Sequence, residues 1–450
     1  MRIGVIIMAA GQGTRMHSSL PKVLHRLLGK PMLEYSLEAA RSVTDVIPIV
    51  VIGHGAEEVR RFLGERARFA IQEPQLGTGH AVLQAAPHYQ GEVDLVLVLP
   101  ADLPLLRPET LRHMLEIQKD NSGPITLLTA VDENARGFGR VVRDGQGAIS
   151  AIVEEAQATP EQLSIQELNV GSYCFEADWL WQALRYIPLS KKGEYYLTDL
   201  AGIAAGEGKE VRAYTVTDKS ETIGVNTRVH LAEAETALRR RLNQEYMLAG
   251  VTFIDPAVAY IEPGVVIGKD TVIWPNTFIQ GNTIIGENCV LGPNAIIRDT
   301  QIGNRCKVFA SVLQEATVED GVDIGPYGHL RKGTHLAEGV HMGNFGEIKN
   351  SYLGPGAKVG HFSYIGDATI GAEVNIGAGT ITCNYDGEKK NPTEIGEGAF
   401  IGSDTMLVAP VKIGEGAKTG AGSVVTKNVP PHSLAVGMPA RVIRKLEKSD

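Results

Sequence analysis

A run of glycine and basic residues directly after the first apolar segment has the composition of a phosphate-binding loop. Residues 3–8 are apolar, and they are followed by Ala9-Ala10-Gly11-Gln12-Gly13-Thr14-Arg15 and, a little later, by Lys22. Glycines free the backbone to curl so that successive N–H groups converge on an anion, and the two basic side chains add positive charge. Taken alone, the motif is more often a glycine-rich turn with solvated basic residues.

Two common nucleotide motifs are excluded at this loop. It lacks the third glycine of the G-x-G-x-x-G fingerprint, and it has no G-K-[ST] of the P-loop kind. Phosphate chemistry here requires a different nucleotide loop.

A second group of residues with chemical potential lies far downstream. Several polar side chains stand on an otherwise regular pattern, namely Arg331, Lys349, His361, Tyr364 and Asn375. Imidazole can accept a proton near neutral pH, so a histidine there is a candidate general base. One histidine among twelve is nevertheless more often structural.

The first 227 residues alternate strand-like and helix-like segments. Apolar runs typical of buried strands lie at residues 3–8, 46–52 and 95–99, and helical spacing with an early proline lies at residues 31–42 and 108–119. The alternation predicts an α/β domain with a mostly parallel sheet, in which ligands gather beyond the carboxyl ends of the strands. Asp102 follows the third strand, so a functional carboxylate is favoured over a surface acid.

Between residues 254 and 425 a bulky aliphatic residue returns at every sixth position. The phase is clearest at Val318, Ile324, Leu330, Leu336, Met342 and Ile348, and it resumes at Ile395, Ile401, Leu407 and Ile413. This period is neither helical nor a simple strand alternation, so it predicts the stacked turns of a parallel β-helix with the aliphatic side chains inside. Residues 382–394 break the period and are expected to project as a loop, where function tends to concentrate.

Residues 227–249 have a helical, strongly charged pattern that reaches Gly250 without an intervening glycine or proline. We expect a long linker helix with Gly250 at its C-cap. Its apolar positions would be Ala232, Leu238, Leu242 and Met247. The three arginines at 239–241 would form a solvated face paired with nearby glutamates.

The composition favours small-molecule chemistry in a reducing compartment. A chain of 450 residues needs two or three domains, and its net charge of −9 argues against nucleic acid as a partner. The four cysteines lack C-x-x-C spacing, so neither zinc nor a disulfide framework is indicated. The scattered cysteines indicate a reducing cytoplasm. No apolar run approaches the ~20 residues of a membrane span, so we expect no membrane partner.

The run from Ala9 to Lys22 resembles the signature loop of the sugar-1-phosphate nucleotidyltransferases. Further motifs continue the likeness in order: Gln72-x4-Gly77-Thr78-Gly79-His80-Ala81, Gly137-Phe138-Gly139-Arg140, Ile152-Val153-Glu154, Leu168-Asn169-Val170-Gly171 and Gly224-Val225-Asn226. Together they resemble the bacterial family of bifunctional N-acetylglucosamine-1-phosphate uridyltransferase/glucosamine-1-phosphate acetyltransferases over the whole chain. The resemblance implies a Rossmann-like nucleotidyltransferase domain (1–227), a linker helix (228–250) and a left-handed parallel β-helix acetyltransferase domain of hexapeptide repeats (251–450).

The resemblance also implies roles for residues of the N-terminal domain. UTP or UDP-N-acetylglucosamine would be bound by Met8, Ala9, Ala10, Gly11, Lys22, Gln72, Gly77, Thr78 and Asn226. Among these residues Gln72, Gly77 and Thr78 would contact the uracil, and Gly139, Glu154 and Asn169 would bind the sugar. Asp102 and Asn226 would hold Mg²⁺, which prefers oxygen ligands; Asn226 is also a candidate N-cap. Arg15 and Lys22 would neutralise charge while a sugar-1-phosphate oxygen attacks the α-phosphorus of UTP. Ala101 departs from the glycine usual before the metal aspartate, which leaves the local geometry open.

For residues 251–450 the resemblance is to the hexapeptide acyltransferases, carried by Gly360-His361-Phe362-Ser363-Tyr364 and residues 375–387. It implies a homotrimer in which His361 is the general base for acetyl transfer. Glucosamine 1-phosphate would be bound by Arg331, Lys349, Tyr364, Asn375 and Lys390. Acetyl-CoA would contact Ala378, Asn384, Tyr385, Ser403 and Ala421. Either Arg441 or Arg444 would supply the arginine that some members place at the tail.

The leading hypothesis is therefore an enzyme with two active sites, which acetylates glucosamine 1-phosphate and joins the product to UMP. Two alternatives stay open: a single-activity sugar-1-phosphate nucleotidyltransferase with a non-catalytic, oligomerising β-helix, and a structural rod that binds a surface. His361 and the loop at Asn384 and Tyr385 speak against the first. The mixed outward polar residues speak against the second, which would need regular ladders of one residue type.

Overall fold

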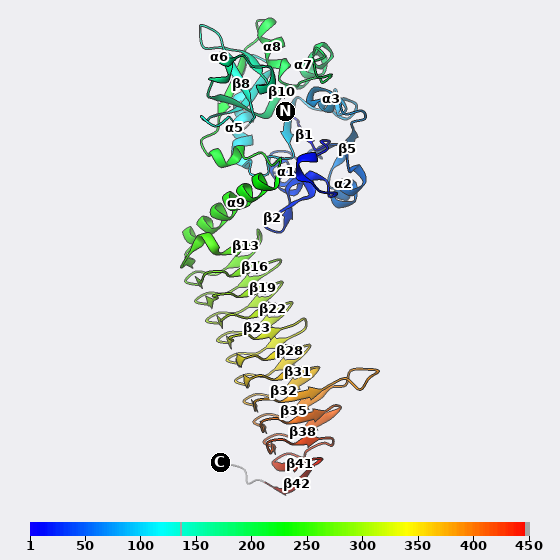
Figure 1. The fold of residues 1–450 in the computed structure, drawn as a ribbon, viewed down its shortest axis with the longest axis vertical. Coiled ribbons are helices and arrows are strands. Elements are labelled where there is room, and N and C mark those ends of the chain that lie inside the picture. Colours follow the sequence, from blue (N-terminus) through cyan, green and yellow to red (C-terminus); the bar gives the residue numbers. More distant parts are fainter. Residues whose placement is uncertain (136, 446–450) are drawn as a thin grey trace. The chain divides into compact units, whose positions relative to one another are not determined.

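The computed structural model describes residues 1–135 and 137–445, which form two compact units (Figure 1). The division between the units falls inside a helix, between Leu238 and Arg239. No helix in these described ranges is long and apolar enough to cross a membrane.

The first unit is built on a mixed nine-stranded sheet. Its main order is β11 (Val211–Thr215), β7 (Ile125–Val131), β10 (Glu167–Glu176), β6 (Leu95–Pro100), β1 (Ile3–Met8), β4 (Ile49–Ile52) and β5 (Arg68–Ile71), with β8 (Gly139–Arg143) and β9 (Ile149–Val153) joined through β10. Strands β5, β4, β1 and β6 are parallel to one another, and β7 is parallel to β11. The expected parallel sheet is thus correct for this core, whereas β10 runs antiparallel to both β6 and β7.

Helices cover both faces of this sheet, which explains why its central strands are continuous apolar runs. Val5 and Ile7 of β1 belong to the core cluster that includes α1 (Met32–Arg41), α2 (Ala56–Leu63) and α5 (Pro108–Lys119), while Ile6 belongs to the opposite cluster. That second cluster includes residues of α3 (Thr78–Leu83), α7 (Ala177–Ala183) and α8 (Asp199–Gly206). The short helices α4 (Ala86–Tyr89) and α6 (Pro160–Leu163) complete the unit.

The predicted linker helix is observed as α9 (Arg228–Leu248). Gly250 has a φ of 97° and donates its N–H to Met247 O, as expected of a C-cap glycine. The expected apolar positions are only partly right, because Ala232 and Met247 are exposed whereas Ala234 and Leu238 are buried. Arg239 is not simply solvated, since its guanidinium lies 4.6 Å from the centre of the Tyr260 ring.

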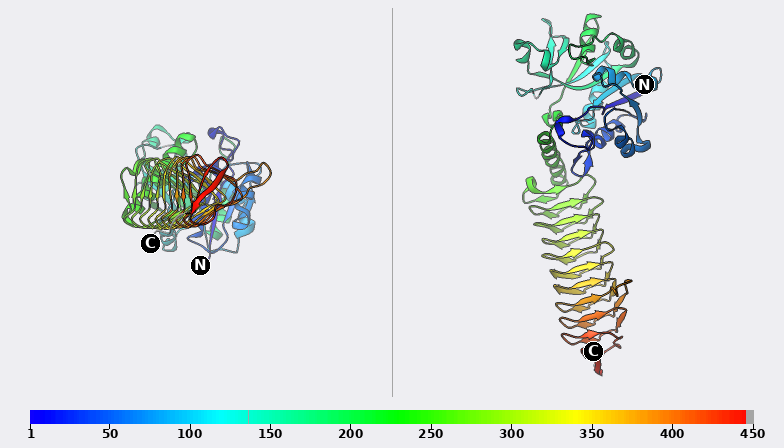
Figure 2. Two further views of the ribbon diagram at one scale, coloured as in Figure 1. Left: turned by 90° about the horizontal axis from the view of Figure 1, so that it is seen from below. Right: turned by 45° about the vertical axis from the view of Figure 1, so that its right-hand side comes forward.

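The second unit is a parallel β-helix with three sheets, whose coils stack as successive rungs (Figures 1 and 2). The twelve-stranded sheet runs from β12 (Thr252–Phe253) to β42 (Ala440–Lys445), the ten-stranded sheet from β13 (Tyr260–Ile261) to β40 (Val424–Val425), and the nine-stranded sheet from β14 (Val266–Ile267) to β38 (Val411–Ile413). Pairing between successive coils is parallel, except that β42 folds back antiparallel on β41 (Ser433–Gly437).

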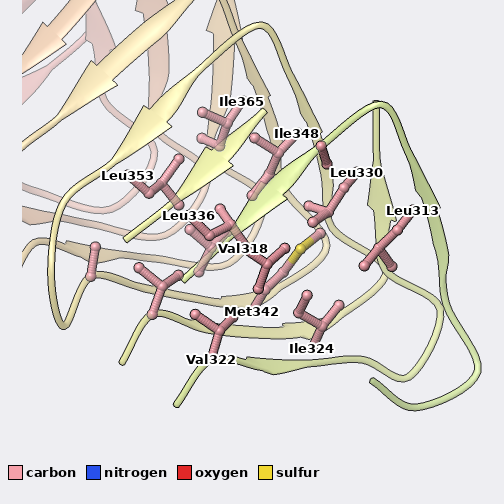
Figure 3. Packing of buried hydrophobic residues seen from close by; sticks show 14 of the residues in the cluster. Leu313, Val318, Val322, Ile324, Leu330, Leu336, Met342, Ile348, Leu353 and Ile365 are labelled. Atoms are coloured by element: carbon pink, nitrogen blue, oxygen red, sulfur yellow. The ribbon is translucent and has the colours of Figure 1, made fainter. Parts of the chain in front are cut away.

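The sixfold aliphatic positions fill the interior of the coils, as predicted. Val318, Ile324, Leu330, Leu336, Met342 and Ile348 are at most 2% exposed and pack on one another (Figure 3). Ile254, where the period was expected to begin, is 52% exposed and points outward. The predicted loop is also shorter than residues 382–394, because β34 (Ile381–Cys383) and β35 (Thr393–Ile395) continue the coil and only residues 384–392 project.

Two candidate active sites

A cavity of about 570 Å³ lies at the carboxyl ends of β1 and β6, where open α/β sheets bind ligands. Most of the predicted nucleotide-binding residues line it, namely Met8, Ala9, Ala10, Gly11, Lys22, Gln72, Gly77 and Thr78. The predicted metal ligand Asp102 lines it too. Gln12, Gln75, Glu194 and Tyr196 line it as well, although none of them was predicted to bind a ligand.

The glycine-rich loop at the cavity is held by contacts to neighbouring segments. Gln75 Nε2 donates a hydrogen bond of 2.6 Å to Ala10 O. Gly13 has a φ of 63°, and a Cβ there would lie 2.7 Å from Lys22 Cβ, so a larger residue would push the lysine out of place. Gly11 has open space around it, which leaves its backbone accessible to a phosphate.

The far wall of the cavity joins the predicted uracil-binding loop to the segment of residues 194–198. Thr78 Oγ1 accepts a hydrogen bond of 2.9 Å from Leu197 N, and Gly79 N donates to Tyr195 O. Gly77 has a φ of 95°, and a Cβ there would meet Tyr195 O at 2.7 Å. The close approach of the Tyr195 backbone explains why glycine stands at positions 77 and 79.

Both predicted metal ligands converge on one positive charge. Lys22 Nζ lies 2.6 Å from Asp102 Oδ2 and 3.0 Å from Asn226 Oδ1. The side chains of Lys22 and Asp102 are only 13% and 24% exposed. The Asp102 and Asn226 oxygens around the Lys22 ammonium are ligands of the kind that Mg²⁺ prefers. Mg²⁺ typically fills its other coordination positions with water and substrate phosphates. No cluster of three His, Cys, Asp or Glu side chains suited to a metal occurs among residues 1–135 and 137–445.

Two open points at the metal pair are settled by the geometry. Thr227 caps α9, since Thr227 Oγ1 accepts from His230 N, so the N-cap role considered for Asn226 is wrong. The Ala101 side chain is 1% exposed within a core cluster, so its methyl group does not enter the cavity.

Arg15 is not brought to this site. It lies exposed on the short 3₁₀ helix η1 (Thr14–Met16) and is not among the cavity-lining residues. It makes no ion pair within the described ranges.

The predicted sugar-binding residues come together on β8, β9 and β10. Gly139 is paired with Asn169, and Glu154 directly follows β9. Asn169 Nδ2 donates to Tyr173 Oη at 2.7 Å, while Glu154 Oε1 accepts from Thr198 Oγ1 at 3.0 Å. Burial raises the pKa of the Glu154 carboxyl, and the negative charges of neighbouring acids add to this shift.

On the β-helix, His361 is held by a residue on the preceding coil. Its Nδ1 lies 3.0 Å from Asn344 Oδ1, and the two residues are partners in the pairing of β27 (His341–Asn344) with β30 (Lys358–His361). Because the amide oxygen can only accept, Nδ1 carries the proton in this arrangement. Nε2 is therefore left with its lone pair for base chemistry.

Three of the predicted sugar-phosphate residues form a basic cluster. Arg331 directly follows β25 (His329–Leu330), and Lys349 ends the strand that pairs with it, β28 (Glu347–Lys349). The positive charges of Lys390 and then Arg331 lower the pKa of Lys349. Glu347 Oε1 accepts from Arg331 Nη1 at 2.7 Å and fixes its direction. Tyr364 starts β31 (Tyr364–Gly366) directly beside Glu347, and Asn375 starts β33 (Asn375–Ile376).

Three of the five predicted acetyl-CoA residues occupy equivalent corners of consecutive coils. Asp404 N donates to Ala378 O, and Gly422 N donates to Ser403 O, so Ala378, Ser403 and Ala421 follow one another along the edge. Asn384 is buried and donates its Nδ2 to Asp367 Oδ2 at 2.6 Å, whereas Tyr385 is exposed. Arg441 and Arg444 both lie on the exposed strand β42.

The projecting loop is internally ordered. Asp386 accepts hydrogen bonds from the backbone N–H groups of Glu388 and Lys389 and from Asn391 Nδ2, which lowers the pKa of Asp386 to about 2. A backbone hydrogen bond from Asn391 to Asn384 closes the base of the loop.

Comparisons with known proteins identify a transferase domain model in each part of the chain. The MobA-like NTP transferase domain model matches residues 5–172, and bacterial transferase hexapeptide repeats match residues 264–299 and 392–427. The chain is 50% identical over 432 residues to the bifunctional protein GlmU of Heliobacterium modesticaldum, covering 96% of this chain and 94% of that protein. It is 46% identical to the proteins of the same name from Pelobacter propionicus (98% and 97% covered) and Enterococcus faecalis (98% and 96% covered).

Proposed function

The chain belongs to the family of bifunctional GlmU proteins, and on that premise we propose which of its residues carry out each reaction. The protein is a uridylyltransferase and an acetyltransferase, with a Rossmann-like nucleotidyltransferase domain and a left-handed β-helix of hexapeptide repeats. It uses Mg²⁺, UTP and acetyl-CoA. Membership in this family removes the two alternatives of a single-activity transferase and a purely structural rod. The division into residues 1–227, 228–250 and 251–450 is proposed with it.

Uridylyl transfer is assigned to the cavity beyond β1 and β6. The backbone of residues 8–11 and the Lys22 ammonium bind the phosphates of UTP. Gln72, Gly77 and Thr78 contact its uracil ring. Gly139, Glu154 and Asn169 hold the sugar so that its 1-phosphate oxygen lies in line with the α-phosphorus. The oxygen attacks that phosphorus, and pyrophosphate leaves.

The observation that supports this assignment is that oxygens of Asp102 and Asn226 both lie within hydrogen-bond distance of the Lys22 ammonium, at the cavity that Lys22 and Asp102 line. Asp102 and Asn226 would hold Mg²⁺, which would neutralise the negative charge shared by the two substrates. Lys22 adds a second positive charge beside them. Arg15 is proposed as a catalytic residue on the resemblance alone, and it would have to turn inward from its exposed position.

Acetyl transfer is assigned to the corner of the rod around His361. The Nε2 atom removes a proton as the glucosamine amine attacks the thioester carbonyl of acetyl-CoA, and the CoA thiolate leaves. Arg331, Lys349 and Lys390 bind the sugar phosphate, while Tyr364 and Asn375 hold the sugar. Acetyl-CoA lies along Ala378, Asn384, Tyr385, Ser403 and Ala421.

A homotrimer through the β-helix and a cytoplasmic location complete the proposal. The acetyl-transfer residues stand on the outside of the rod, where His361 and Tyr385 are exposed, so a second rod laid alongside would close the site. Exposed aromatic rings at Phe345 and Phe362 near His361 fit such contacts. UTP and acetyl-CoA are intracellular metabolites, which supports the location.

One incubation tests the whole proposal. The protein is mixed with glucosamine 1-phosphate, acetyl-CoA, UTP and Mg²⁺, and the expected product is UDP-N-acetylglucosamine. Omission of acetyl-CoA should abolish the product, and added N-acetylglucosamine 1-phosphate should restore it. Absence of the nucleotide sugar in the complete mixture would overturn the proposal.

A further inference from the structure

A buried carboxylate ties together the two chain segments that carry Asp102 and Asn226. Glu221 is 3% exposed and lies on the 3₁₀ helix η6 (Lys219–Thr222). Its Oε2 accepts a hydrogen bond of 2.8 Å from the backbone N–H of Arg107 and one of 2.7 Å from Thr110 Oγ1. Neither the nucleotide cavity nor the sugar residues include Glu221.

The groups bound by Glu221 are those at the start of α5. Arg107 is the N-cap of this helix, and its first N–H groups have no partner within the helix. A carboxylate is stabilised there by the helix dipole and by charge-assisted hydrogen bonds. The Arg107 side chain adds a positive charge 3.9 Å from Glu221 Oε1.

A second contact connects the same two segments directly at the predicted ligands. Val225 N, next to Asn226, donates a hydrogen bond of 2.8 Å to Asp102 O. Residues 102–107 and 221–226 are thus fastened at both ends, by a backbone hydrogen bond near the ligands and by the Glu221 carboxylate at the opposite end.

We propose that Glu221 is a positioning residue for the metal site, because it fixes the spacing between the Asp102 and Asn226 oxygens without touching the metal or a substrate. This inference rests on the proposed role of those two residues as Mg²⁺ ligands. Apolar packing already holds the loop, since Leu103 and Leu106 are buried in the adjoining core cluster. Hydrogen bonds to a fixed carboxylate add direction, which apolar packing does not supply.

Loss of the carboxylate is expected to weaken metal binding more than it weakens the fold. Groups that orient metal ligands change metal affinity by about 10-fold to 100-fold when they are removed. In Glu221→Gln the negative charge is lost and an N–H₂ group replaces the oxygen that lies beside the Arg107 guanidinium. The two hydrogen bonds at the other oxygen lose their charge assistance, so the spacing of the two ligand segments is less firmly fixed. Thr110→Val removes one of the two donors and leaves the charge in place, so a smaller shift in the same direction is expected.

The test is a titration of Mn²⁺, followed by its EPR signal, into full-length protein saturated with UDP-N-acetylglucosamine. Without pyrophosphate this complex does not turn over, so the readout is metal affinity alone. We expect about tenfold weaker binding for Glu221→Gln. The matched control is Glu34→Gln, which removes a part-buried carboxylate paired with Arg66 and should leave Mn²⁺ binding unchanged. Acetyl transfer by the same chains serves as an internal measure of active protein.

The outcomes separate this inference from the proposed function. Asp102→Ala should lose Mn²⁺ binding; if it does not, the ligand assignment itself fails. If Asp102→Ala loses binding while Glu221→Gln matches the control, the positioning role is wrong. Should Glu221→Gln fail to fold, seen as loss of the native Trp179 and Trp181 fluorescence, Thr110→Val decides, and an unchanged Mn²⁺ affinity in that variant overturns the inference.

Discussion

The ammonium of Lys22 lies 2.6 Å from Asp102 Oδ2, within the space where the predicted metal ligands meet. Asn226 Oδ1 is 3.0 Å from the same nitrogen. Lysine and Mg²⁺ therefore cannot both sit between these oxygens. With Mg²⁺ held by Asp102 and Asn226, the Lys22 side chain would turn toward the substrate phosphates and supply positive charge there.

Lys22→Ala should consequently separate metal binding from catalysis. Removing the competing ammonium is expected to tighten Mn²⁺ binding several-fold, while uridylyl transfer falls by at least about 100-fold because the phosphates lose a fixed positive charge. EPR titration and pyrophosphate release measure the two effects. Lys30→Ala, which removes an equal charge paired with Glu38 at the surface, is the control. Equal metal affinity in the two variants would refute the competition.

His361→Ala should lose acetyl transfer and keep uridylyl transfer, because the two reactions use different units. A general base contributes about 100-fold to 10,000-fold, so CoA release should fall by that range. Asn344→Ala should give a smaller loss, since the ring keeps its base but is no longer held in one tautomer by Asn344 Oδ1. Equal damage to both reactions in His361→Ala would indicate a structural histidine.

Much of this arrangement was predictable from the sequence because period and motif reflect local physics. The sixfold aliphatic residues had to be buried, and the glycines at 13 and 77 had to allow positive φ angles. The antiparallel β10 was not predictable, because strand direction is decided by pairing across the sheet and leaves no local pattern. Glu194, Tyr196 and Gln75 were missed for a related reason, since tertiary folding alone brings them to the cavity.

The loop boundaries show a different limit. Thr382 and Thr393 fall in the stretch that breaks the sixfold period and were therefore expected in the projecting loop, yet both are buried in the coil. Thr382 Oγ1 accepts from Gly366 N and can donate to a carbonyl oxygen there, so a hydroxyl is tolerated inside. Side-chain hydrogen bonds of this kind cannot be inferred from hydrophobic periodicity.

Glu154→Gln is expected to stabilise the first unit at neutral pH while weakening sugar binding. Burial raises the pKa of Glu154 above its ordinary value of 4.5, so the folded state holds a proton more tightly than the unfolded state. Its stability therefore falls as pH rises from about 4.5 to the raised pKa, and stays lower above it. Unfolding followed by tryptophan fluorescence should show a higher midpoint for Glu154→Gln at pH 7 and none of that gain at pH 4. A gain that is the same at both pH values would exclude burial of the charge as its cause.

Asp386→Ala should loosen the projecting loop and impair acetyl transfer. The pKa of Asp386 is lowered to about 2, so its hydrogen bonds are fully present at neutral pH and are lost only as pH falls through that value. Without them Tyr385 and Lys390 are no longer held, and the KM values for both acetyl-transfer substrates should rise. Trypsin should cleave the variant after Lys389 or Lys390 faster than the parent protein. Glu388→Ala, in the same loop, should behave like the parent; if both variants are cleaved alike, Asp386 does not order the loop.

The basic cluster of Arg331, Lys349 and Lys390 should make binding of the sugar phosphate depend on pH, because the neighbouring charges lower the pKa of Lys349. Lys390 is the main reason why the pKa of Lys349 is lowered, and Arg331 adds to it. The positive form of Lys349 is present below that pKa and is lost as pH rises through it. Affinity for the sugar phosphate should therefore begin to decline at a lower pH than it would with a lysine of ordinary pKa. In Lys390→Ala the KM for glucosamine 1-phosphate should be higher at neutral pH, yet its rise should begin at a higher pH because Lys349 regains a more ordinary pKa. Lys389→Ala is the matched control, and comparing each variant with the parent protein at every pH cancels the titration of the substrate amine. A parallel pH profile for all three proteins would mean that Lys349 does not bind the phosphate.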